Sequence, residues 1–243
     1  MLRDLVEKII VLKGGIPMEL AFHEKFVLLT INDETGAIAF GYSKSYGFAG
    51  ALLLEMVNSE VIELKDKRIH ILKTKLDSEI LQEAINLLKN KKKPQKIINA
   101  IQIIGNKMQK KFDNVIDNLI VKGILYKEEK KVLWVFTSKR YPTNNPTPEN
   151  LIKSKIKGII LYGNQANRDS MDLISLVHIL NLQKKIFSKE EMKNAKKKIK
   201  EIIKEEKISK NPQSIFHQQI MKAVMISIAV TSATNTWLFY TMK

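Results

Sequence analysis

Apolar residues recur every three or four positions along most of the chain, and this spacing predicts a mainly helical protein. One helix is expected over residues 77–89, with Asp77 as its N-cap and Pro94 beyond its end. The next helix should turn Ile97, Ile98, Ile101 and Ile104 inward. The most regular stripe predicts a helix over residues 107–121 that stops at Gly123, and its apolar positions are Met108, Phe112, Val115, Ile116, Leu119 and Ile120.

The segment from residue 26 to residue 72 has an unusual order of patterns. An apolar run predicts a strand, a loop of Gly, Ser and Tyr residues follows, and the chain then becomes a strongly apolar helix. Such a loop at the start of a helix suits an anionic ligand, because the helix offers unpaired N–H groups and glycine lets the backbone approach closely. Two short alternating runs, joined by Lys65, Asp66 and Lys67, end the segment and predict a hairpin.

A helix followed by two short strands occurs twice, at residues 49–72 and at residues 107–136. In the second copy, the runs ILY and VLWVF predict strands on either side of a charged turn at residues 127–131. This unit is similar to the second half of a winged helix, in which the hairpin is the wing.

The C-terminal part is predicted to be helical after a Pro-rich loop at residues 141–149, with helices near residues 150–162, 170–184, 188–206 and 215–240. Ser188 and Glu191 form a capping-box signature. Residues 223–242 carry no charge, a length that could span a bilayer. Because seven Ser, Thr and Asn residues dilute this segment, a central helix buried on all sides is the favoured interpretation.

The predicted fold class is therefore mainly α, a compact helical bundle with short β-hairpins. We expect a single domain over residues 1–243, with residues 1–17 as an N-terminal extension. The N-terminal residues 1–13 mix charged and apolar positions and do not resemble a secretory signal, so a cytoplasmic protein is expected.

The net charge of +16 indicates a polyanionic partner, either nucleic acid or an acidic membrane surface. The alternative is that a general abundance of Lys, Ile and Asn places lysines on solvated faces without a ligand. The chain has no cysteine, which excludes disulfides, thiolate zinc sites and cysteine nucleophiles. We find no phosphate loop, dinucleotide fingerprint, HExxH motif or nucleophile elbow, and the four histidines have no metal-ligand spacing. No catalytic residue, metal or cofactor is therefore expected.

The order of several blocks resembles the Golgi phosphoprotein 3 family. These blocks are LLTIND, GAIAF, GFAGALLLEM, DNLIVKGILY with its hairpin, NRDSMDLISLVHIL and KKKIKEIIKE, and they extend from about Met18 to near the C-terminus. The resemblance implies a mainly helical domain with a projecting β-hairpin. It also implies a peripheral membrane adaptor, not an enzyme, that binds phosphatidylinositol 4-phosphate and the cytoplasmic tails of membrane proteins. The departures described next indicate a divergent member, for which we expect a bacterial source.

The family's headgroup pocket uses a loop aromatic, a base between two glycines, and arginines on the helix before NLIVKGIL. Tyr42 can serve as the aromatic, but Ala49 replaces the base, and Gln109 and Phe112 fall where the arginines would be. Nearby lysines can substitute, three of them on what is predicted to be one polar helix face. The expected headgroup-binding residues are Tyr42, Lys44, Lys107, Lys110 and Lys111. Since lysine lacks arginine's bidentate geometry, headgroup selectivity should be weak.

Three other interpretations remain open. The helix at residues 107–121 could read nucleic acid, since it offers three lysines together with Asn114 and Asn118. The second hairpin could join subunits into an oligomer through Leu133, Trp134 and Val135. Finally, the aromatic residues of the loop could simply pack onto the bundle, with all the lysines solvated.

Overall fold

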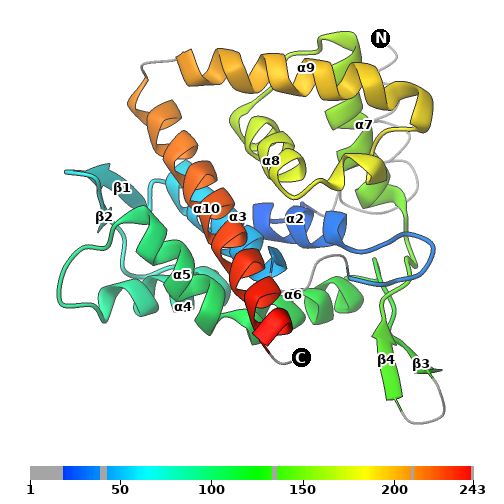
Figure 1. Ribbon diagram of the computed structural model, residues 1–243, viewed down its shortest axis with the longest axis horizontal. Helices are drawn as coiled ribbons and strands as arrows, with labels where there is room; N and C mark the ends of the chain where they lie inside the picture. Colours follow the sequence, from blue (N-terminus) through cyan, green and yellow to red (C-terminus); the bar gives the residue numbers. More distant parts are fainter. Residues whose placement is uncertain (1–18, 39–42, 133–135, 209–210, 242–243) are drawn as a thin grey trace.

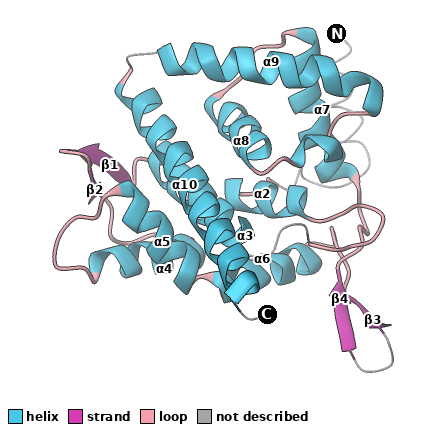
Figure 2. Ribbon diagram, viewed as in Figure 1, coloured by secondary structure: helices cyan, strands magenta, loops and turns pink. Residues whose placement is uncertain are grey.

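The computed structural model describes residues 19–38, 43–132, 136–208 and 211–241 of the 243-residue chain. This part is mainly α, as predicted, with two small antiparallel hairpins (Figures 1 and 2). The strands are β1 (Ile62–Lys65), β2 (Arg68–Ile71), β3 (Glu128–Val132) and β4 (Phe136–Arg140). The helices are α2 (Phe22–Thr30), α3 (Ser43–Asn58), α4 (Glu79–Lys89), α5 (Ile97–Lys107), α6 (Gln109–Val121), α7 (Thr147–Tyr162), α8 (Arg168–Ile179), the 3₁₀ helix η1 (Leu182–Lys185), α9 (Lys189–Ile208) and α10 (Pro212–Thr241).

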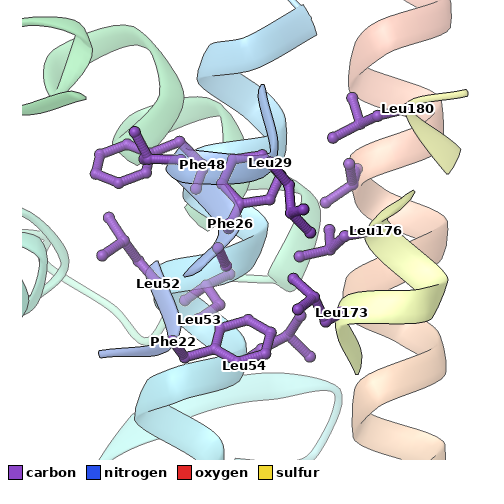
Figure 3. Close-up of a cluster of buried hydrophobic side chains, with 14 of the residues drawn as sticks. Phe22, Phe26, Leu29, Phe48, Leu52, Leu53, Leu54, Leu173, Leu176 and Leu180 are labelled. Atoms are coloured by element: carbon purple, nitrogen blue, oxygen red, sulfur yellow. The ribbon is translucent and has the colours of Figure 1, made fainter. Parts of the chain in front are cut away.

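Helix α3 is the central element of the core. Its sequence is apolar on every side, and the consecutive residues Leu52, Leu53 and Leu54 are all fully buried. A helix that is hydrophobic all round must be covered all round, and α2, α5, α8 and α10 pack against it. Figure 3 shows leucine and phenylalanine side chains of α2, α3 and α8 filling the space between these helices.

The prediction that the C-terminal helix is the one buried on all sides is wrong. One face of α10 packs against α3 and α5, with Val224 fully buried. Another face is open to solvent, where Met225, Ile226 and Val230 are 49%, 42% and 53% exposed. In the described part of the chain, no helix is both long enough and apolar enough to cross a membrane.

The apolar run after Phe26, predicted as a strand, is helix α2. A short apolar run bounded by turn residues does not distinguish a buried strand from a buried helix by its periodicity. Helix α2 is buried on nearly every side, so its sequence carries no amphipathic signal. Its start is fixed by Glu24, whose carboxylate accepts a hydrogen bond from the Ala21 N–H at 3.0 Å.

The glycines of the expected anion-binding loop have a different role. Gly47 and Gly50 lie within α3, and a Cβ atom at Gly50 would lie 2.6 Å from Cγ2 of Val224 on α10. A Cβ atom at Gly47 would lie 2.7 Å from Cδ1 of Leu180 and 2.8 Å from Cζ of Phe26. The two glycines therefore let neighbouring side chains pack directly against the α3 backbone.

Two helix boundaries differ from the sequence-based expectation. The N-cap of α4 is Ser78, whose hydroxyl accepts a bond from the Leu81 N–H, and not Asp77. The helix expected over residues 107–121 is interrupted at Met108, so Lys107 ends α5 and α6 begins at Gln109. The capping box at the start of α9 is confirmed, since the backbone N–H groups of Ser188 and Glu191 each donate to the other's side chain.

The first hairpin is confirmed, with a turn at Asp66 and Lys67 in the left-handed backbone region. The second hairpin is displaced along the chain. Of the five charged residues predicted as its turn, four (128–131) belong to strand β3, and Val132 pairs with Phe136 at the closed end of the hairpin. Ile124 and Leu125, predicted as a strand, are buried, and Leu125 forms an isolated bridge to Thr143. Leu133, Trp134 and Val135 lie outside the described residues.

The close approach at Gly50 can be tested with one substitution made at two sites. Replacing either Gly50 or Gly158 with Ala adds about 1 kcal/mol of helix propensity. At Gly158 the new methyl group meets only the exposed side chain of Asn164, which can move away. At Gly50 it overlaps buried Val224, so Gly50→Ala should be less stable than Gly158→Ala by about 1–3 kcal/mol in urea unfolding. Equal free energies of unfolding for the two variants would show that α10 does not pack closely against Gly50.

Candidate functional surface

Three helix ends meet on one side of the molecule. The aromatic ring of Tyr46, in the first turns of α3, packs against Gly105 near the end of α5, where an added Cβ would lie 2.7 Å from the ring. The Tyr46 hydroxyl donates a hydrogen bond to Asn106 Oδ1 at 3.2 Å. Helix α6 then begins at Gln109. The N-terminal ends of α3 and α6 and the C-terminal end of α5 are thereby held together.

Lys44 lies in the first turn of α3, and not in a loop as expected. Its Nζ atom lies 5.0 Å from the ring centroid of Phe112 on α6, a cation–π contact. Phe112 is only 1% exposed and stacks edge-on against Phe48. This confirms that Phe112 faces the core, and the contact places Lys44 beside the start of α6.

Lys107 and Lys110 lie on two different helices but close together in sequence, on either side of the break at Met108. Both side chains are exposed. Within the residues that the structure describes, neither they nor Lys44 form an ion pair with a carboxylate. We refer to Lys44, Lys107 and Lys110 as the basic surface. Their charges remain available to an anion.

Lys111 is different, because its charge is already balanced. Its Nζ atom lies 2.7 Å from Glu83 Oε2 and 3.1 Å from Glu79 Oε1, both on α4. The hydrogen bonds to Glu83 and Glu79 raise the pKa of the Lys111 ammonium group. Lys111 therefore joins α4 to α6, and the predicted shared polar face of three equivalent lysines is not present.

The start of α6 adds backbone donors to the basic surface. Its N-cap residue is Met108, whose side chain accepts no hydrogen bond from the first N–H groups of the helix. The first turn contains no acidic residue. Unpaired N–H groups and the positive end of the helix dipole favour an anion at such a terminus. Lys110 lies within this turn, so both kinds of positive potential coincide.

The remaining positions taken from the family pattern contribute less. Ala49 is fully buried within α3, so this position adds no polar group to the surface. Gln109 is exposed at the start of α6. Tyr42 lies outside the described residues. Within the described residues, the expected site is thus represented by its lysines.

The exposed face of α6 carries acidic as well as amide side chains. Asp113 and Asp117 alternate with Asn114 and Asn118 along it, and all four are exposed. Carboxylates on a recognition helix repel the phosphates that such a helix must approach. This arrangement argues against the winged-helix nucleic-acid interpretation.

A second candidate is an apolar groove of about 720 Å³ between α8, α9 and α10. Beside it lies a buried polar cluster that sequence patterns did not reveal. Arg168 donates to Asp172 at 2.7 Å and to Glu206 at 2.5 Å, while His217 Nε2 is 2.8 Å from Asn58 Oδ1. These residues come from α8, α9, α10 and α3, so only the folded chain brings them together.

Burial governs the titration of this cluster. It raises the pKa of the Asp172 carboxyl, although the hydrogen bond from Arg168 opposes the shift. It lowers the pKa of the His217 imidazole, against the attraction of Asp172. No nucleophile is hydrogen-bonded to His217 within the described residues, and no cluster there could hold a metal ion. The cluster therefore connects four helices through hydrogen bonds and ion pairs.

The family model for Golgi phosphoprotein 3 (GPP34) matches residues 22–225, which contain both the basic surface and the buried cluster. No curated protein matches the chain.

The buried cluster can be tested by its contribution to stability. Asp172→Ala removes a fully buried carboxylate and leaves Arg168 and His217 without it, so the free energy of unfolding should fall by about 3–5 kcal/mol. Glu201→Ala is the control, because among the described residues Glu201 pairs only with exposed lysines of its own helix. The control should change stability by less than about 1 kcal/mol in the same denaturant titration. Similar effects of both substitutions would contradict a stabilising role for the cluster.

Proposed function

Because the chain belongs to the Golgi phosphoprotein 3 family, we propose that it is a peripheral membrane adaptor that binds anionic phospholipid headgroups through the basic surface. The observation that carries the proposal is the meeting of Lys44, Lys107 and Lys110 at three helix ends with their charges unpaired by described residues. The neighbouring Lys111 is neutralised by two carboxylates. An anionic ligand would supply the counter-charge that the three other lysines lack.

Binding follows from electrostatics at close range. Each lysine near an anionic leaflet contributes about 1 kcal/mol, an attraction that extends over about one Debye length. The uncapped start of α6 offers N–H groups to a phosphate oxygen. Since lysines act as point charges and form no bidentate pairs, we propose charge-driven binding with modest preference among headgroups. More specifically, we propose that one such headgroup is that of phosphatidylinositol 4-phosphate, the ligand implied by the family resemblance.

The biological role proposed is that of an adaptor without catalytic activity. It would lie at the cytoplasmic face of a membrane, and its protein partners would be cytoplasmic tails of membrane proteins. The family membership supports this role.

Vesicle co-sedimentation tests the proposal directly. The intact protein is mixed with neutral vesicles, with vesicles containing phosphatidylserine and with vesicles containing phosphatidylinositol 4-phosphate, beside a duplex-DNA mobility shift at the same salt. Binding to both anionic vesicles that weakens as salt rises supports the proposal. Failure to sediment with any anionic vesicle at low salt, together with a DNA shift, would refute it in favour of nucleic-acid binding.

The basic surface itself is tested by a charge-matched pair of variants. Lys107→Ala with Lys110→Ala should weaken binding to anionic vesicles by roughly 30-fold, since two contributions of about 1 kcal/mol are lost. Lys193→Ala with Lys196→Ala removes the same charge from exposed positions of α9 and should change binding little. If both variants lose affinity equally, overall charge rather than this surface controls binding.

A further inference from the structure

Helix α10 has an exposed face whose chemistry changes along the helix. Gln218, Gln219 and Lys222 lie on its first half, and Lys222 is exposed. From Ala223 to Val230 the exposed side chains are all apolar and lie at helical spacing: Met225, Ile226, Ala229 and Val230. A contiguous apolar stripe on a solvent-exposed surface indicates a binding site for an apolar partner, such as a protein or a membrane. We call these four residues the α10 stripe.

The α10 stripe lies toward the same end of the fold as the basic surface. Helix α10 runs antiparallel to α3 (Figure 1), and the two touch where Gly50 meets Val224. The residues of α10 beyond Val224 therefore extend toward the start of α3, where Lys44 lies. Helix α10 also packs along α5, which ends at Lys107.

Two hydroxyl groups near the stripe are hydrogen-bonded within the helix. The Thr231 hydroxyl donates to the Ser227 carbonyl, and the Ser232 hydroxyl donates to the Ile228 carbonyl, both at 2.9 Å. Such bonds to the preceding helical turn let hydroxyl groups enter an apolar medium. Between Gln213 and Met242 the only charged residue, besides the titratable His217, is Lys222. A long lysine at the polar end of an apolar stripe can keep its ammonium group at the headgroup level.

The structure assigns a partner to this surface. We propose that the α10 stripe enters the outer acyl region of an anionic leaflet while the basic surface engages headgroups, so that α10 acts as an interfacial helix. This inference rests on the proposed function and adds the element that penetrates the lipid. Charge complementarity favours an anionic membrane over a second copy of the chain, because Lys222 adjoins the stripe on α10 and the end of the fold toward which the stripe extends carries Lys44 and Lys107. The apolar groove beside Met225 extends the same surface toward α8 and α9.

The natural absence of cysteine makes a site-specific probe straightforward. An environment-sensitive nitrobenzoxadiazole label is attached to Ile226→Cys, and the control label is attached to Tyr162→Cys, which is 76% exposed at the end of α7. With phosphatidylserine vesicles, emission at position 226 should increase and shift to shorter wavelength, and brominated acyl chains should quench it. The label at position 162 should not respond. As a second variant, unlabelled Ile226→Asp should bind these vesicles about tenfold more weakly or worse.

The outcomes separate this inference from the proposed function. Sedimentation of the labelled protein with no change at position 226 would overturn the α10 inference and leave headgroup binding intact. Failure of the unlabelled wild-type protein to sediment would overturn both. If the emission of the label at position 226 changed with protein concentration in the absence of vesicles, the stripe would join two copies of the chain. This result would also overturn the inference.

Discussion

The need to bury helix α3 on every side determines much of this structure. Its leucines face in all directions, so α2, α5, α8 and α10 must each cover a part of it. Close packing requires short distances between helices, and Gly47 and Gly50 provide them where Phe26, Leu180 and Val224 press against the backbone. A helix enclosed in this way can interact with a ligand only at its ends.

The basic surface follows from that arrangement. Tyr46 fixes the start of α3 against the end of α5, and Lys44 reaches the start of α6 through its contact with Phe112. The three lysines come from three helices, yet the packing of apolar side chains beneath them sets their separation. Bringing like charges together costs free energy, and described carboxylates offset this cost only at Lys111. The three lysines at these helix ends are thus left without a described carboxylate partner, and the headgroup proposal rests on this imbalance.

Sequence patterns predicted the fold class, the first hairpin and most of the helices, because amphipathic spacing reports directly on which face is buried. They failed for two helices. Helix α2 was mistaken for a strand because a helix buried on nearly every side has no polar face to reveal its period. Helix α10 was expected to be buried on all sides because the residues on its exposed face, such as Met225, Ile226 and Val230, are apolar as well. The break at Met108 also carried no signal, since Met108 is itself buried and fits the apolar stripe on either side.

The candidate site was predicted only in part for a related reason. The family resemblance and helical spacing suggested Lys44, Lys107, Lys110 and Lys111 together. Neither could show that Lys111 is paired, because its partners Glu79 and Glu83 are about 30 residues earlier in the chain. The cluster of Asn58, Arg168, Asp172 and His217 is likewise assembled from distant segments. Pairings of this kind depend on tertiary contacts that no local pattern encodes.

Hydrogen–deuterium exchange of the wild-type protein, with and without anionic vesicles at low salt, tests the central claim most directly. The account predicts slower exchange in the presence of vesicles over residues 43–46, 105–111 and 222–232, with exchange over α7 and α9 unchanged. The account would be contradicted if the vesicle-bound protein were protected over α9 or the β1–β2 hairpin, while residues 43–46, 105–111 and 222–232 exchanged at the same rate as in solution.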